Sequence, residues 1–242
     1  MKVRGSELEM SRSRPEVRED STTSSRRERN GSSPDLVVVG NVRGKKLRFN
    51  PLRNNVASAL CKKLRIKPEK CEVPSSTRWG SLGAPCKNKE TEADGNCFFR
   101  ALSQTVCGSQ KHHLRFRLAV VKHLENNAAA YESILRSNYS SMADYLEASQ
   151  MPYLGSWATE VEIQAAADCF GINVFTFCDG QWLEYSCSKK ARSRQGVYLE
   201  NCDGNHYENV VCVQRPRKQG CYGYCRVAHV VLEGTTFKST RE

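Results

Sequence analysis

The stretch that decides the fold reads Asp94-Gly95-Asn96-Cys97-Phe98-Phe99-Arg100-Ala101-Leu102. Asp-Gly-Asn is typical of a sharp turn, and the apolar residues after it recur at the spacing of one helix face. The sequence therefore predicts a turn followed by a helix. If Asn96 is the N-cap, Cys97 is the first helical residue, where free backbone N–H groups and the helix dipole favour a thiolate.

Cys97 has two interpretations at this position. A cysteine beside two phenylalanines is commonly a small buried apolar residue. A cysteine at a helix N-terminus can instead have a lowered pKa and act as a nucleophile. The second interpretation requires a base elsewhere in the chain, because a thiol nucleophile needs a group that takes its proton.

The candidate base is His206, in the segment Gly204-Asn205-His206-Tyr207-Glu208-Asn209-Val210. Its turn residues lead into a predicted strand. Alternate residues of a strand point to the same side, so the Glu208 carboxylate can lie near the His206 imidazole and fix its tautomer. A single histidine at a strand start is otherwise a surface or hydrogen-bonded core residue.

The chain has 242 residues, a net charge of +11 and 12 cysteines. Its length suits one domain with extensions. The N-terminal residues contain no apolar signal segment, and no apolar run is long enough to span a membrane. We therefore expect a soluble, intracellular protein of the cytoplasm or nucleus whose cysteines are reduced.

The charge is uneven along the chain. Residues 34–90 carry 13 basic and 4 acidic groups, whereas residues 91–214 carry 10 basic and 14 acidic groups. The basic segment 34–90 can contact nucleic acid or an acidic partner, or it can be a solvated charged surface. The acidic balance of residues 91–214 suits a basic partner surface.

Composition divides the chain into four parts. They are a disordered tail rich in Ser, Arg and Glu (1–34), a basic accessory segment with its linker (35–90), a central domain that holds Cys97 and His206 (91–214) and a basic C-terminal extension (215–242). In the accessory segment, the sequence predicts a hairpin between residues 36–39 and 46–49, a helix over 51–65 and a linker over 68–92.

Within the central part, helical patterns precede strand patterns. Helices are predicted after Asn96, over 111–127 with Leu114, Leu118, Val121 and Leu124 on one face, after Ser141, and from Thr159 to Gly171. Strands are predicted over 172–177, 182–185, 197–200 and 206–213. This order indicates an α+β domain with helices packed around a small, mostly antiparallel sheet.

Three segments, in this order, resemble the signature motifs of the ovarian tumour (OTU) domain. They are Asp94-Gly95-Asn96-Cys97-Phe98-Phe99-Arg100-Ala101, Gly155-Ser156-Trp157-Ala158-Thr159-Glu160-Val161-Glu162-Ile163-Gln164-Ala165-Ala166-Ala167 and Gly204-Asn205-His206-Tyr207-Glu208. The OTU family consists of papain-like cysteine proteases that remove ubiquitin, and the resemblance covers roughly residues 90–214.

The resemblance implies a papain-like OTU fold and a deubiquitinase that forms a thioester on Cys97. It implies that His206 is the general base and later the acid, and that Asp94 belongs to the loop that shapes the oxyanion hole. Backbone N–H groups near Gly95 and Cys97 would face the oxyanion. The implied partner is ubiquitin or a polyubiquitin chain, ubiquitin-like modifiers remain open, and no metal or cofactor is implied.

Two positions in these motifs carry alternatives. The residue two after the histidine is often Asp or Asn in the family and is Glu208 here, so either Glu208 or Asp94 orients His206. Trp157 either lines the cleft or packs the loop.

Three other functions compete with hydrolysis. An OTU-like module can bind ubiquitin without cleaving it, or with only weak activity. The basic segment 34–90 can make the protein nucleic-acid-associated. A zinc site can form from Cys221, Cys225 and His229, with Cys202 or Cys212 as a fourth ligand.

Overall fold

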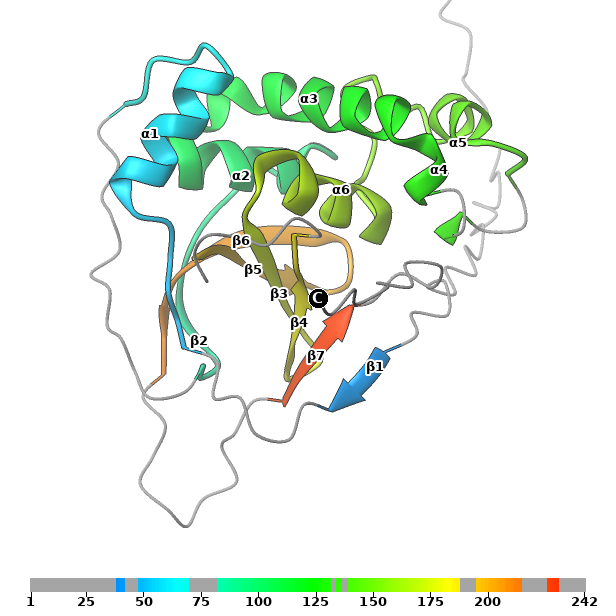
Figure 1. Ribbon diagram of the computed structural model, residues 1–242. Helices are drawn as coiled ribbons and strands as arrows, with labels where there is room; N and C mark the ends of the chain where they lie inside the picture. The colour runs from blue at the N-terminus through cyan, green and yellow to red at the C-terminus, as the bar shows by residue number, and fades with distance from the viewer. Residues whose placement is uncertain are drawn as a thin grey trace, which may run out of the picture. The chain divides into compact units, whose positions relative to one another are not determined.

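A computed structural model of the protein describes residues 38–41, 48–69, 82–131, 134–135, 139–187, 195–214 and 226–230. Its helices gather on one side of a sheet (Figure 1). They are α1 (Asn54–Lys63), α2 (Cys97–Cys107), the 3-10 helix η1 (Gln110–His112), α3 (His113–Asn126), α4 (Ala128–Tyr131), α5 (Met142–Ala148) and α6 (Glu160–Phe170). Among the described residues, no helix has both the length and the apolar character that crossing a membrane requires.

The described strands form one sheet in the order β1-β7-β4-β3-β5-β6-β2. They are β1 (Val38–Asn41), β2 (Pro85–Lys89), β3 (Asn173–Cys178), β4 (Gln181–Tyr185), β5 (Gly196–Cys202), β6 (His206–Val213) and β7 (Arg226–Val230). The pairs β3–β5 and β4–β7 are parallel, and the other four are antiparallel. The predicted α+β class with a mostly antiparallel sheet is confirmed.

Helix α2 forms where the sequence predicts it. It begins at Cys97 and ends before Gly108, which has a φ of 80° in the left-handed region that favours glycine. Asn96 occupies the N-cap position, but its side chain makes no capping hydrogen bond to the helix. The expected cap is therefore absent, because the Asn96 amide is bonded elsewhere.

Helix α6 follows the predicted capping box closely. The Thr159 hydroxyl accepts from the Val161 N–H, and the Glu162 carboxylate accepts from the Thr159 N–H at 2.7 Å. Gly171 ends the helix with a φ of 66°. The β3–β4 hairpin also forms across Asp179 and Gly180 as expected.

The apolar face predicted for α3 is partly wrong. Leu114 and Leu118 are exposed, whereas Phe116, Arg117, Val120, Val121 and Leu124 are buried. The predicted face begins with Leu114 and Leu118, which are four residues apart and lie beside the buried face of the helix. A charged residue, Arg117, occupies the buried face, and apolar periodicity cannot reveal such a residue.

Two predictions for the segment before residue 91 are also wrong. Strand β1 pairs with β7 and not with residues 46–49, of which Arg48 and Phe49 are outside any strand. Part of the predicted linker forms β2, which pairs with β6 at the sheet edge. An edge strand can begin with proline and lack alternating apolar residues, as Pro85–Lys89 does.

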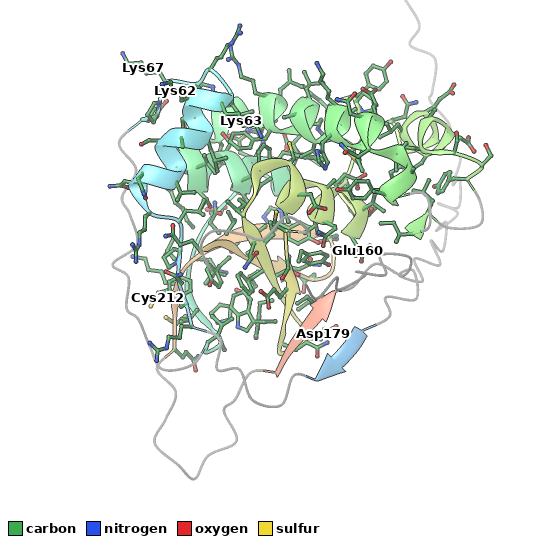
Figure 2. All side chains as sticks on the ribbon, in the orientation of Figure 1. Lys62, Lys63, Lys67, Glu160, Asp179 and Cys212 are labelled. Atoms are coloured by element: carbon green, nitrogen blue, oxygen red, sulfur yellow. The ribbon has the colours of Figure 1, made fainter. Side chains whose placement is uncertain are left out.

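Helix α1 is close to its predicted range and packs into the main core. Leu60 and Cys61 are buried there, and the Cys61 thiol donates to the Val106 carbonyl at 3.4 Å. Its basic side chains Lys62 and Lys63 lie at the exposed C-terminal end of the helix (Figure 2). Residues on both sides of position 90 thus share one core, and the domain boundaries at 34, 90 and 214 stay a prediction.

Several predictions fall outside the described residues. They concern the disordered tail 1–34, most of the C-terminal extension, and the cysteines 221 and 225 of the candidate zinc site.

Candidate active site

The candidate site lies where the N-terminus of α2 meets the start of β6. The two elements are joined by an edge-to-face contact between Phe98 and Tyr207, with ring centroids 5.7 Å apart. The Thr105 hydroxyl donates to Asn209 Oδ1 at 2.6 Å. These contacts bring Cys97 next to the loop that precedes β6.

The Cys97 sulfur lies 3.9 Å from the Asn205 carbonyl oxygen. Cys97 as a whole is only 6% exposed. Burial raises the pKa of the thiol, although the backbone N–H groups of Tyr207, Phe98 and Cys97 itself act in the opposite direction. The prediction of a lowered pKa is therefore wrong for the free protein, because desolvation outweighs the helix N-terminus.

His206 is the first residue of β6 and lies near Glu208. Its Nε2 is 3.9 Å from Glu208 Oε1, with both side chains about one fifth exposed. This contact confirms that alternate residues of the strand bring the two side chains to the same side. It is a close electrostatic contact and exceeds hydrogen-bond length.

Glu208 is held from the neighbouring strand by a residue that sequence reasoning missed. Asn88 Nδ2 donates to Glu208 Oε2 at 3.2 Å and also to Glu200 Oε2. Glu200 and Glu208 are directly opposite each other on β5 and β6. Like charges at such a pair repel, so the amide between them offsets the repulsion. Asn88 lies in the predicted linker, where no signal pointed to a site.

Asp94 is bound within the turn before Cys97 and by Arg100 of α2. Its carboxylate accepts from Arg100 Nη2 at 2.6 Å and from the Asn96 N–H at 3.0 Å. The hydrogen bonds from Arg100, reinforced by those from Asn96, hold the pKa of Asp94 well below its usual range. Of the two acids considered for orienting the histidine, Glu208 is the one that lies within 4 Å of His206.

Gly95 adopts a conformation that requires glycine. Its φ is 79°, and a Cβ atom there would lie 2.2 Å from the Gly155 carbonyl oxygen. The turn before Cys97 therefore packs directly against the loop around Gly155. Asn96 joins the same two loops, because its Oδ1 accepts from the Gly155 N–H at 3.0 Å.

Arg117 of α3 is bonded to both loops and was also missed. Its guanidinium donates to Asn96 Oδ1 and to the Ser156 carbonyl, at 2.9 Å and 2.7 Å. No sequence signal distinguishes it from the other basic residues of this predicted helix, such as Arg115.

The loop after α5 presents apolar side chains to solvent. Tyr153, Leu154 and Trp157 are 63%, 56% and 54% exposed. Trp157 is thus not packed inside the loop, which was one of its two interpretations. Among the described residues, no group of three or more His, Cys, Asp and Glu side chains is arranged to hold a metal ion.

Comparison with known proteins identifies relatives of the central part of the chain. A family model described as “Vertnin, OTU domain” matches residues 89–154, which include Cys97 but not His206. “OVARIAN TUMOR DOMAIN-containing deubiquitinating enzyme 9” of Arabidopsis thaliana is 43% identical over 96 residues, which are 38% of this chain and 26% of that protein.

“OVARIAN TUMOR DOMAIN-containing deubiquitinating enzyme 7” of Arabidopsis thaliana is 28% identical over 144 residues, which are 60% of this chain and 36% of that protein. The chain therefore spans about a quarter to a third of the length of these curated relatives. The solved structure of the OTUD1 OTU domain aligns with a TM-score of 0.45 and 20% identity, over 50% of this chain and 83% of that chain.

Proposed function

Because the chain belongs to the ovarian tumour (OTU) domain family, we propose that it is a cysteine-dependent deubiquitinase. The observation that carries this proposal is the 3.9 Å separation between the Cys97 sulfur and the Asn205 carbonyl, directly before His206. The printed names of the relatives, which are deubiquitinating enzymes, support ubiquitin as the substrate.

In the proposed reaction, Cys97 is the nucleophile and His206 the base. His206 takes the thiol proton as the sulfur attacks the carbonyl carbon of the C-terminal glycine of ubiquitin. The imidazolium then gives that proton to the leaving lysine amine, which leaves a thioester on Cys97. Water activated by His206 hydrolyses the thioester and restores the thiol.

The raised pKa of Cys97 makes the base essential in this scheme. Burial keeps the resting sulfur as a thiol at neutral pH. Removal of the thiol proton by His206 is therefore part of the proposed reaction. Glu208 would stabilise the imidazolium that forms, because its carboxylate lies 3.9 Å from Nε2.

The oxyanion of the tetrahedral intermediate would be held by the backbone N–H groups of Gly95 and Cys97. Asp94 would shape this turn, since its carboxylate binds Arg100 and the Asn96 N–H. One such donor is typically worth about 3 to 4 kcal/mol of the barrier.

Ubiquitin chains of defined linkage test this proposal. The purified protein is expected to release mono-ubiquitin on a gel, and the Cys97→Ala variant is expected to release none. Parallel reactions with ubiquitin-like modifiers would identify the modifier class. Binding of ubiquitin with no release by the wild type would favour the alternative of a binding module.

A second candidate function, contact with nucleic acid, rests on the charge of α1 and the residues after it. Lys62, Lys63, Arg65 and Lys67 are all exposed. If they bind a polyanion, affinity for a single-stranded oligonucleotide falls steeply with salt, and Lys62→Glu with Lys67→Glu weakens it. Lys122→Glu, an exposed site on α3, is the matched control. Equal binding by both variants would exclude this contact.

A further inference from the structure

The Arg117 guanidinium is buried, and its hydrogen bonds go to neutral partners. The residue is 0% exposed, and no carboxylate of the described residues lies within ion-pair distance of it. Burial lowers its pKa to about 10, so the group stays charged at neutral pH. The Glu162 and Asp94 carboxylates oppose this shift from beyond ion-pair distance, and the guanidinium lies 4.4 Å from the centroid of the Phe99 ring. A buried cation whose direct hydrogen bonds go only to neutral acceptors is still costly. Packing alone therefore does not account for it.

The partners of Arg117 belong to two loops. Nη2 lies 2.9 Å from Asn96 Oδ1 and 3.4 Å from the Gly95 carbonyl, both in the turn before Cys97, and it shares its two hydrogens among these acceptors and the Ser156 carbonyl. Nη2 also donates to the Ser156 carbonyl at 2.7 Å, and Nη1 donates to the Met151 carbonyl at 3.0 Å. One side chain thus ties the turn to the loop after α5.

Arg117 also determines how the Asn96 amide is oriented. Asn96 Oδ1 accepts from two donors, Arg117 and the Gly155 N–H. Its Nδ2 donates to the Asp94 carbonyl at 3.3 Å and to Asp94 Oδ2 at 2.8 Å. Rotating the amide by half a turn would place donors against donors, so the four hydrogen bonds are made in one orientation only.

These bonds fix two successive peptide planes of the turn. In a trans peptide the C=O and the N–H point in opposite directions. The Asp94 carbonyl points to Asn96 Nδ2, so the Gly95 N–H points away from it. The Gly95 carbonyl points to Arg117, so the Asn96 N–H points away, where it donates to Asp94 Oδ1 at 3.0 Å.

We propose that Arg117 is a positioning residue that keeps the Gly95 N–H oriented as an oxyanion donor. This inference deepens the proposed hydrolysis and rests on it. Without the guanidinium, Asn96 Oδ1 and the Gly95, Met151 and Ser156 carbonyls lose a donor. The Asn96 amide can then rotate, and the Asp94–Gly95 peptide that it holds is free to flip. The Cys97 thiol itself is not bound to Arg117, so its intrinsic reactivity should survive.

Arg117→Met tests the proposal, with Arg115→Met as the matched control. Arg115 is an exposed residue of the same helix, and it donates to the Leu64 and Arg65 carbonyls at the end of α1. In Arg117→Met, kcat on a fluorogenic ubiquitin substrate should fall about 100-fold or more, with KM within threefold. Alkylation of Cys97 by iodoacetamide, which forms no oxyanion, should stay within threefold. Arg115→Met should match the wild type.

Hydrogen exchange of the backbone amides in residues 94–96 gives a readout that needs no activity. Exchange should be faster in Arg117→Met than in Arg115→Met. If the wild type cleaves no ubiquitin substrate, the proposed function fails. Hydrogen exchange then still tests whether Arg117 holds the turn of residues 94–96 in place. If Arg117→Met does not fold, Arg117→Lys, which keeps the charge but loses the planar fork, replaces it. Unchanged exchange, or a kcat within threefold of wild type, would overturn the inference.

Discussion

The Cys97 sulfur lies 3.9 Å from the carbonyl oxygen of Asn205, a residue 108 positions away in the chain. Asn205 directly precedes His206, so the contact brings the start of α2 to the start of β6. The Phe98–Tyr207 ring contact and the Thr105–Asn209 hydrogen bond hold the two elements together.

The first prediction compares His206 with Glu208. Loss of a general base typically costs about 10²- to 10⁴-fold, so His206→Ala should lower kcat by that amount. Glu208→Ala should cost less, because a 3.9 Å contact orients the imidazole without taking its proton. Steady-state kinetics on a ubiquitin substrate measures both losses.

Asp94→Asn provides the matched comparison for Glu208→Gln. Because Glu208 lies 3.9 Å from His206, Glu208→Gln should lower kcat, since the imidazole loses its orienting carboxylate. Because Asp94 binds Arg100 and Asn96, Asp94→Asn should instead loosen the turn, which faster hydrogen exchange of the Asn96 amide would report. A loss of kcat in Asp94→Asn alone, with exchange unchanged, would assign the orienting role to Asp94.

The second prediction concerns the pH dependence of Cys97 reactivity. Its pKa is raised by burial, so the thiolate fraction grows with pH and does not saturate near neutrality. The rate of iodoacetamide alkylation at Cys97 should still be rising at about pH 8.5, the ordinary pKa of a free cysteine. Peptide mapping separates this site from the other cysteines. A plateau below pH 7 would mean that a thiolate exists in the free protein.

The third prediction concerns the exposed apolar loop. Trp157 is 54% exposed, and its loop is tied to the turn before Cys97 through Gly155 and Asn96. Trp157→Ala should raise KM for ubiquitin about tenfold or more, since buried aromatic contacts contribute strongly to binding. The unfolding midpoint should not change. Leu118→Ala, at a 47% exposed site on α3, should leave KM as it is. Equal effects of the two variants would remove Trp157 from the binding surface.

The fourth prediction tests whether α1 belongs to the folded unit. Leu60 is 6% exposed in the main core, so Leu60→Ala should lower the free energy of unfolding by about 2 to 5 kcal/mol. Ser58→Ala, at an exposed position of the same helix, should change it by no more than about 0.5 kcal/mol. Urea unfolding measures both. A negligible effect of Leu60→Ala would make the segment before residue 91 a true accessory.

Much of the fold was readable from local patterns. The turn and helix at Cys97, the capping box at Thr159 and the Asp179-Gly180 hairpin each have a short-range cause, and each forms as predicted. Strand β2 was missed because an edge strand needs no apolar alternation. The pairing of β1 with β7 depends on residues almost two hundred positions apart, which no local pattern encodes.

The site was less predictable than the fold. The contact between His206 and Glu208 follows from strand periodicity. Asn88 and Arg117 reach the site from other elements, so no spacing in the sequence identifies them. The pKa of Cys97 was predicted in the wrong direction because the helix N-terminus is local, whereas desolvation depends on the whole packed structure.

The most direct test of the central claim is reaction with a ubiquitin whose C-terminus carries a thiol-trapping electrophile. The wild type should gain the mass of one ubiquitin, and digestion should locate the adduct on Cys97. Cys97→Ala should form no adduct and should still bind ubiquitin. An adduct on another cysteine, or none in the folded wild type, would contradict the assignment of Cys97 as the nucleophile of a deubiquitinase.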